Sequence, residues 1–228
     1  AVTFDGGALP VVQLLFAPLL TFTGDPAQEK GTVVPHLADR FQVSEDGLRI
    51  TLWISKSARF HDGAPVLAKD VVRSIERALH PDTPNPVSSF YERLQGYSAF
   101  TARKALHISG LTVLSDHALS IDLAEPDASF LSVLALPTLA PVCASAGERY
   151  DREFAKKACG AGPYTLDTWD QGAKITVKRF DGYFEAGKPY LDSIEWSLVM
   201  PPFTQRLKFE RGELDLVRDL NDGDLAVY

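Results

Sequence analysis

The sequence predicts a mixed α/β fold of the α+β type, in which strands joined in hairpins are interspersed with a few helices. Three observations predict it. Apolar and polar residues alternate between Phe41 and Ile54 on both sides of an Asp46-Gly47 turn, a pattern typical of a two-stranded hairpin. Between Ala68 and Leu79 the apolar residues instead recur at helical spacing. Further strands are expected at residues 108–123, 164–170, 174–180 and 192–199.

The helices follow from the same kind of pattern. The amphipathic helix that begins at Ala68 carries Val71, Val72 and Ile75 on its apolar face, and Pro81 ends it. Further helical segments are expected at residues 10–20, 88–97 and 204–215, the last with Gly212 close to its end. The polar segment between the first helix and the hairpin is expected to form a loop.

Composition excludes several classes of protein. The chain has 228 residues, of which 45% are hydrophobic and 23% charged, as expected of a globular domain able to build a core. Its net charge is -7 and its basic residues are scattered, so a nucleic-acid-binding surface is not expected. No apolar run approaches the roughly 18 to 20 residues that span a bilayer. The first twenty residues lack a basic segment, so any signal sequence is expected to lie outside this sequence.

No group of residues indicates catalysis. His61-Asp62 has no accompanying nucleophile, since the chain lacks a G-x-S-x-G motif and neither cysteine adjoins a histidine. We therefore interpret His61 as a turn residue and expect no enzyme activity, no catalytic residue and no cofactor. The other histidines lack metal-ligand spacing and predict no metal site. The remaining acidic pairs, interpreted as solvated surface, are Asp192 with Glu195 and Glu213 with Asp215.

The two cysteines leave two possibilities open. Cys143 and Cys159 enclose fifteen residues, and a disulfide closing that loop would stabilise the fold by about 3 kcal/mol. Alternatively, they are two separate buried thiols.

A series of short motifs runs through the chain in a fixed order. The first group comprises Pro35, Leu37, Ala38, Phe41, Val43, Ser44, Asp46 and Gly47, followed by Phe60, His61, Asp62, Gly63, Pro65, Ala68, Asp70, Val71 and Ser74. Four later blocks are GLTVLSDHALSIDLAEPDASFL, GAGPYTL from Gly160, RFDGYF from Arg179 and RGELDLV from Arg211. Together they resemble family 5 of the bacterial extracellular solute-binding proteins, over about Phe16 to Val217. The chain departs from the family pattern at Ile54-Ser55-Lys56-Ser57 and at Ala161.

The resemblance implies an architecture. We expect a lobe of the periplasmic-binding-protein type, class II or cluster C, with an inserted β-rich subdomain. Residues 1–38 and 160–228 would form the incomplete core of this first lobe, and residues 39–159 the insertion. The second lobe, which closes over the ligand in this family, is expected to be absent from the sequence.

The resemblance also implies a function. The parent protein would capture a solute, expected to be a short peptide, and deliver it to the membrane permease of an ABC importer. It would do so in the periplasm or outside the cell, with or without a lipid anchor. The alternative is a ligand-sensing module of a regulatory or signalling protein.

Two places in this lobe are candidate ligand contacts. Asp5, Gly6, Gly7 and Ala8 resemble a segment that presents backbone groups to an extended peptide, although a terminal turn is an equally good interpretation. Phe90 and Tyr91 match an aromatic position that lines the cleft, and the alternative is that they belong to the core.

Overall fold

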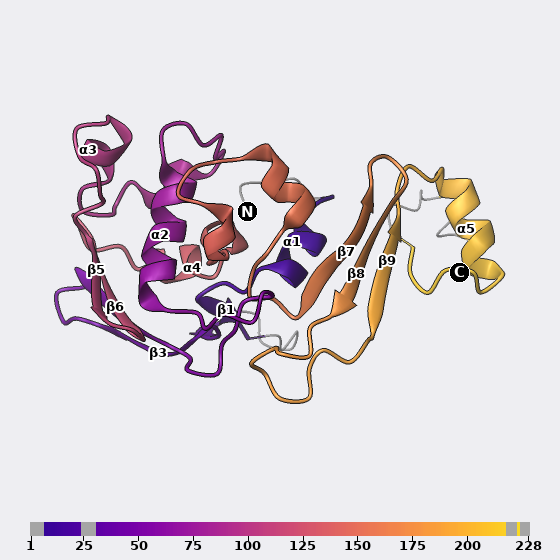
Figure 1. Cartoon of the computed structure of the whole chain (residues 1–228), viewed down its shortest axis with the longest axis horizontal. Helices are drawn as coiled ribbons and strands as arrows, with labels where there is room; N and C mark the ends of the chain where they lie inside the picture. The colour runs from indigo at the N-terminus through magenta and orange to yellow at the C-terminus, as the bar shows by residue number, and fades with distance from the viewer. Residues whose placement is uncertain (1–6, 24–30, 218–222, 224–228) are drawn as a thin grey trace. The chain divides into compact units, whose positions relative to one another are not determined.

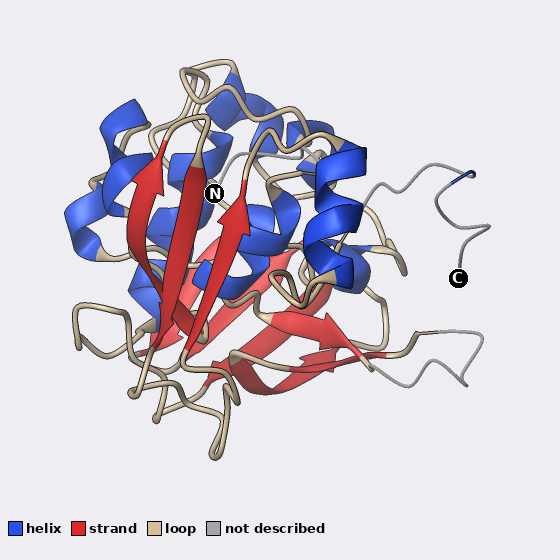
Figure 2. Ribbon diagram, turned by 90° about the vertical axis from the view of Figure 1, so that its right-hand side faces the viewer, coloured by secondary structure: helices blue, strands red, loops and turns tan. Residues whose placement is uncertain are grey.

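The structure, a computed structural model, describes residues 7–23, 31–217 and 223. The chain divides into two compact units, the first comprising Ala1–Leu166 with Lys178–Asp192 and the second Asp167–Val177 with Ser193–Tyr228. Figures 1 and 2 show strands joined by helices and long loops, which is the mixed fold that the sequence predicts. The lobe core and insertion expected from the family resemblance stay a prediction.

A four-stranded antiparallel sheet organises the first unit. Its strands are β3 (Ala38–Val43), β4 (Arg49–Ile54), β6 (Ala118–Asp122) and β5 (Leu111–Ser115), in that spatial order. The predicted hairpin between β3 and β4 is confirmed, and Gly47 has the positive φ of +70° that the turn requires. A short second sheet pairs β1 (Leu20–Phe22) with β2 (Val33–Pro35).

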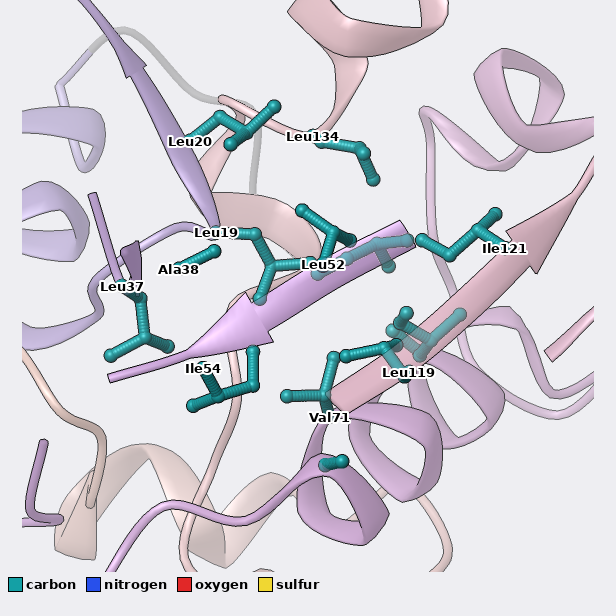
Figure 3. Close-up of a cluster of buried hydrophobic side chains, with 14 of the residues drawn as sticks. Leu19, Leu20, Leu37, Ala38, Leu52, Ile54, Val71, Leu119, Ile121 and Leu134 are labelled. Carbon is teal, nitrogen blue, oxygen red and sulfur yellow. The ribbon is translucent and has the colours of Figure 1, made fainter. Parts of the chain in front are cut away.

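The core of the first unit lies between this sheet and helix α2 (Ala68–Leu79). In register, Leu52 of β4 pairs with Leu119 of β6, and both side chains are fully buried. Val71 of the helix faces them, and Figure 3 shows these side chains pointing toward one another. The predicted helix begins and ends as expected, and Asp70 in its first turn accepts a hydrogen bond from the amide of Leu67 at 3.1 Å, which satisfies a donor at the helix start.

The first helix is shorter than the sequence pattern predicts. Helix α1 covers Leu9–Leu15, and Phe16 is already extended, with φ and ψ of -131° and 119°. Pro18 disfavours helical backbone at the residue before it, so the chain leaves the helix early and continues into β1. The predicted helix at 88–97 is likewise split in two, because Gly96 turns the chain with a φ of +84°. The remaining helical elements of the unit are η1 (Ser88–Tyr91), α3 (Tyr97–Thr101), α4 (Phe130–Val133), η2 (Pro137–Leu139), η3 (Ala144–Ala146) and η4 (Arg152–Lys157).

The C-terminal third of the chain adds a third sheet. Its strands β7 (Tyr164–Asp170), β8 (Lys174–Arg179) and β9 (Ser193–Ser197) confirm three predicted strands, and they lie in that order. Helix α5 (Pro202–Glu210) begins two residues before the predicted helix and ends earlier. Gly212, with a φ of +70°, stops it.

A close approach of two backbone segments joins α1 to the start of β7. The amide of Gly162 donates to the carbonyl of Leu15 at 3.1 Å, and a Cβ added to Gly162 would collide with backbone atoms of Leu14 and Leu15. His61 fixes the same segment from the other side. Its Nδ1 lies 3.3 Å from the amide of Gly160, which donates to it, and its Nε2 lies 3.1 Å from the carbonyl of Gly162, to which it donates. His61 is therefore a structural clamp that acts in its neutral form.

A disulfide closes the loop that leads into this segment. Cys143 and Cys159 are bonded, with their Cα atoms 5.5 Å apart, and the amide of Cys143 donates to the carbonyl of Cys159 at 3.1 Å. Two arginines of α2 reach over the enclosed loop. Arg73 donates to the carbonyl of Val142 and Arg77 to that of Ala146. Hydrogen bonds from α2 therefore hold the start of the loop, and the disulfide joins its two ends.

We expect Leu52→Ala to lower the free energy of unfolding by about 3 kcal/mol, because it removes a fully buried side chain between sheet and helix and leaves a cavity. Urea unfolding followed by circular dichroism would measure this. Thr51→Ala changes the neighbouring residue, which faces the other side of the sheet, and should cost well under half as much. Equal losses in the two variants would contradict the assigned register.

We also expect the free energy of unfolding to fall as the pH drops below about 6.5. Burial lowers the pKa of His61 in the folded chain, so between the folded and unfolded pKa the unfolded chain binds more protons. The contribution of His61 to the free energy of unfolding is complete at pH values above the pKa it has in the unfolded chain. It is lost as the pH falls through the pKa it has in the folded chain.

His36 and His80 also have lowered pKa values and act in the same direction, so the test compares variants. His61→Gln should reduce the loss of stability between pH 7.5 and 5.5. An unchanged pH dependence in His61→Gln would rule out the clamp as its source.

Candidate functional site

Adjacent aromatic residues in η1 have opposite environments. The ring of Tyr91 is fully buried, lies edge-on to Phe130 at a centroid distance of 6.3 Å, and its hydroxyl is 3.1 Å from that of Thr138. Burial raises the pKa of Tyr91 to about 12, so the hydroxyl stays protonated. Phe90, in contrast, is 46% exposed. Tyr91 anchors the segment from below, and Phe90 is the ring available to a ligand.

The local sequence explains this arrangement. Asn85 follows α2, and its side-chain amide donates to the carbonyl of Ala78 in the last turn of the helix at 3.1 Å. The oxygen of the same side chain accepts from the amide of Val87 at 3.1 Å. Val87 is also buried, so the short segment between α2 and η1 is held at one end by the helix and at the other by the core. A 3₁₀ turn places successive side chains on different sides, which separates Phe90 from Tyr91.

Phe90 borders a pocket of about 600 Å³, which is within the size range of small-ligand sites. We call it the Phe90 pocket. Residues of η1, α3, α4 and the loops beside them line it: Ser89, Phe90, Glu92, Arg93, Tyr97, Ser98, Asp127, Ser129 and Val133. Its walls therefore combine two aromatic rings with several hydroxyl groups and carboxylates.

The charged groups of the Phe90 pocket differ in how they are held. Arg93 forms an ion pair with Glu125, which occupies its guanidinium. One oxygen of Asp127 accepts from both the amide and the hydroxyl of Ser129, at 2.9 and 2.6 Å. Glu92 is exposed at the rim. The pocket can thus hold an apolar side chain against Phe90 and accept hydrogen bonds from a cationic or amide group.

The other predicted ligand segment is only partly within the described residues. Asp5 and Gly6 lie outside them. Gly7 is exposed, and Ala8 caps α1 by accepting a hydrogen bond from the amide of Val12 at 3.1 Å. Neither Gly7 nor Ala8 is among the residues that line the Phe90 pocket. Their role in ligand binding stays a prediction.

One group of potential metal ligands occurs in the described residues. Oxygen and sulfur atoms of Asp62, Cys143 and Cys159 all lie within 4.8 Å of one another. Because both sulfurs are joined in the disulfide, neither is a thiolate, and a single carboxylate remains.

Two further hollows lie on the first unit. One, of about 590 Å³, runs along α2 and is lined by Lys69, Arg73 and Glu76 together with neighbouring loops. The other, of about 530 Å³, lies at one end of the four-stranded sheet, where the guanidinium of Arg40 is 3.9 Å from the ring centre of Trp53. Neither hollow is lined by a residue of the two predicted ligand segments.

The sequence indicates Phe90 as a candidate contact but none of the residues that line the Phe90 pocket with it. Asp127 and Ser129 lie in one of the motif blocks and Tyr97 in an expected helical segment, but no pattern indicates that they meet Phe90 in the folded chain. The position of Asp62 beside the disulfide was likewise missed, because about eighty residues separate it from the nearer cysteine. No local pattern in the sequence could have indicated either grouping.

Known proteins resemble this chain in sequence and in fold. It is 32% identical over 177 residues to the glutathione-binding protein GsiB of Salmonella choleraesuis, a match covering 78% of this chain and 32% of that protein. The chain therefore spans about a third of the length of this relative.

No helix in the described part of this chain has the length and apolar character needed to cross a membrane.

Solved structures share the fold. The murein tripeptide binding protein MppA of Escherichia coli superposes with a TM-score of 0.88 at 24% identity, over all of this chain and 44% of that one. Peptide-bound OppA of Listeria monocytogenes gives a TM-score of 0.82 at 24% identity, over 93% of this chain and 42% of its own. The binding protein AgaA from A. tumefaciens R10, in complex with agropinic acid, gives a TM-score of 0.72 at 26% identity, over 90% of this chain and 38% of that one. These likenesses show that the chain has the fold of these proteins.

The model of one protein family matches residues 32–228, most of the chain. Its range includes the Phe90 pocket, the His61 clamp and the disulfide. The chain belongs to the bacterial extracellular solute-binding proteins, family 5.

Proposed function

We propose that this chain is the ligand-capturing first lobe of a solute-binding protein that binds short peptides and delivers them to the membrane permease of an ABC importer. Its family membership carries the proposal, since the matching model spans residues 32–228. The names of its relatives favour peptides: GsiB binds glutathione, itself a tripeptide, and OppA is bound to peptide. A protein with this role works in the periplasm or at the cell surface, with or without a lipid anchor.

The architecture proposed with this function is that of the family resemblance. Residues 1–38 and 160–228 form the core of the lobe, residues 39–159 form the inserted subdomain, and a second lobe from elsewhere in the parent protein closes over the ligand. Closure buries the ligand and strengthens each polar contact, because water is excluded.

The Phe90 pocket supports recognition of a peptide side chain. The exposed ring of Phe90 offers an apolar contact, while Ser89 and Ser98 offer hydroxyl groups. Backbone groups of the segment from Asp5 to Ala8 would contact the peptide main chain, which is the same for every sequence. A site built in this way tolerates many side chains.

The parent protein should bind di- to pentapeptides and release heat in isothermal titration. Glutathione is the first single peptide to test, because a relative binds it. Agropinic acid, which AgaA binds, is the non-peptide comparison. Binding of agropinic acid or a sugar, with no heat from any peptide, would overturn the assignment to peptides and leave family membership intact.

Phe90→Ala in the parent protein should weaken peptide binding about five- to tenfold, because it removes an apolar contact from the pocket. Phe22→Ala is the matched control, since Phe22 is 44% exposed and lies in β1. It should bind as the parent protein does. Unchanged affinity in Phe90→Ala, measured by the same titration, would show that the ligand binds elsewhere.

A further inference from the structure

Asp62 lies beside the disulfide although it is distant from both cysteines in sequence. Its carboxylate follows Phe60 and His61 in a tight turn and accepts a hydrogen bond from the amide of Ala64 at 3.0 Å. That bond fixes the direction of the side chain. A carboxylate oxygen and the two disulfide sulfurs lie within 4.8 Å of one another. A negative charge is therefore held next to the disulfide by the fold.

The two cysteines differ in exposure. Cys143 is completely buried, whereas Cys159 is partly exposed. Asp62 is exposed as well. Of the two cysteines, Cys159 is therefore the one that solvent can reach, and it has an exposed carboxylate beside it.

Thiols attack a disulfide as thiolates, so the charge on the attacking molecule matters. A fixed charge within 4.8 Å acts well inside the screening length of about 8 Å at physiological salt. The Asp62 carboxylate repels every attacking thiolate, most strongly one that carries an additional negative group and least one whose positive group offsets the thiolate charge. It also disfavours the negative charge that develops on the leaving sulfur.

We propose that Cys159 is a site of thiol–disulfide exchange whose reaction partner is selected by charge, and that Asp62 makes the selection against anionic thiols. A thiolate attacks Sγ of Cys159, the bond to Cys143 breaks, and Cys143 leaves as a thiolate that takes a proton from water. A second thiol then attacks the mixed disulfide. The protein is reduced to two thiols, and the two small thiols are oxidised to their own disulfide.

Two cations near the disulfide are paired with carboxylates of their own. Arg73 donates to the carbonyl of Val142, next to the buried Cys143, and its guanidinium is also within 3.5 Å of the carboxylate of Asp70. Lys156, in the loop before Cys159, is 2.9 Å from Glu153. Asp62, in contrast, accepts a hydrogen bond from the backbone amide of Ala64.

The test uses three thiols that share one carbon skeleton and differ in charge: 2-mercaptoethanesulfonate, 2-mercaptoethanol and cysteamine. Rates of reduction of the native chain are measured by counting free thiols, with and without the substitution Asp62→Asn. The substitution removes the charge but keeps an oxygen that can accept from Ala64. The rate with the anionic thiol, whose thiolate carries two negative charges, should rise about three- to tenfold. The rate with the neutral thiol, whose thiolate carries one, should rise less, and the rate with the cationic thiol, whose thiolate is a zwitterion, should change least.

Two further variants separate charge from structure. Asp46→Asn removes the carboxylate of another Asp-Gly turn, which accepts a backbone hydrogen bond in the same way, and it should change none of the rates. Asp62→Glu keeps the charge and should retain the order of the three thiols found in the native chain. Mass spectrometry of the trapped adduct should place the first mixed disulfide on Cys159.

The outcomes are distinct. An equal change with all three thiols in Asp62→Asn would indicate a loosened fold and overturn selection by charge, and so would unchanged rates. An adduct first formed on Cys143 would overturn the proposed site of attack. None of these results depends on which ligand the parent protein binds.

Discussion

The close approach of residues 160–162 to the end of α1 is the constraint on which the first unit depends. Side chains at Gly160 and Gly162 would overlap the chain near Leu15 and Phe16, so only glycine permits the contact. His61 then fixes the segment through both ring nitrogens. The strand that follows begins at Tyr164, directly after this contact.

The disulfide extends the same constraint to the loop in front of it. The disulfide joins the two ends of the segment 143–159, and Arg77 of α2 donates to the carbonyl of Ala146 near its start. The segment just before this loop carries Thr138, whose hydroxyl supports Tyr91 beneath the Phe90 pocket. The exposed position of Phe90 therefore depends on a chain of contacts that leads back to the disulfide and to α2. A ligand site on a short 3₁₀ turn needs this support, because such a turn has few hydrogen bonds of its own.

Features encoded locally could be predicted from the sequence. The hairpin at Gly47, helix α2 and the strands β7 to β9 follow from periodicity and turn residues, and the structure contains each of them. The first helix was predicted too long, because the apolar residues after Phe16 are buried as extended chain and not as helix. Periodicity cannot distinguish a buried helix from a buried extended segment when every residue in a run is apolar. The prediction of a single helix at 88–97 was wrong for another reason. Gly96 has a left-handed backbone conformation, which interrupts the helix that the composition favours.

The candidate site could be predicted only in part, and two pairs of residues show why. Phe90 and Tyr91 are neighbours of similar chemistry, yet a hydroxyl partner in η2 draws one ring into the core and leaves the other outside. Asp46 and Asp62 each precede glycine and accept a backbone amide two residues on. The first lies in an exposed hairpin turn, while the second meets a disulfide whose cysteines come from segments far along the chain. In both pairs the sequence determines the local geometry, and the partner that gives the residue its chemistry is supplied by the fold. A prediction of function from local pattern alone therefore stops at the family, and contacts between distant segments are needed to identify the residues that act.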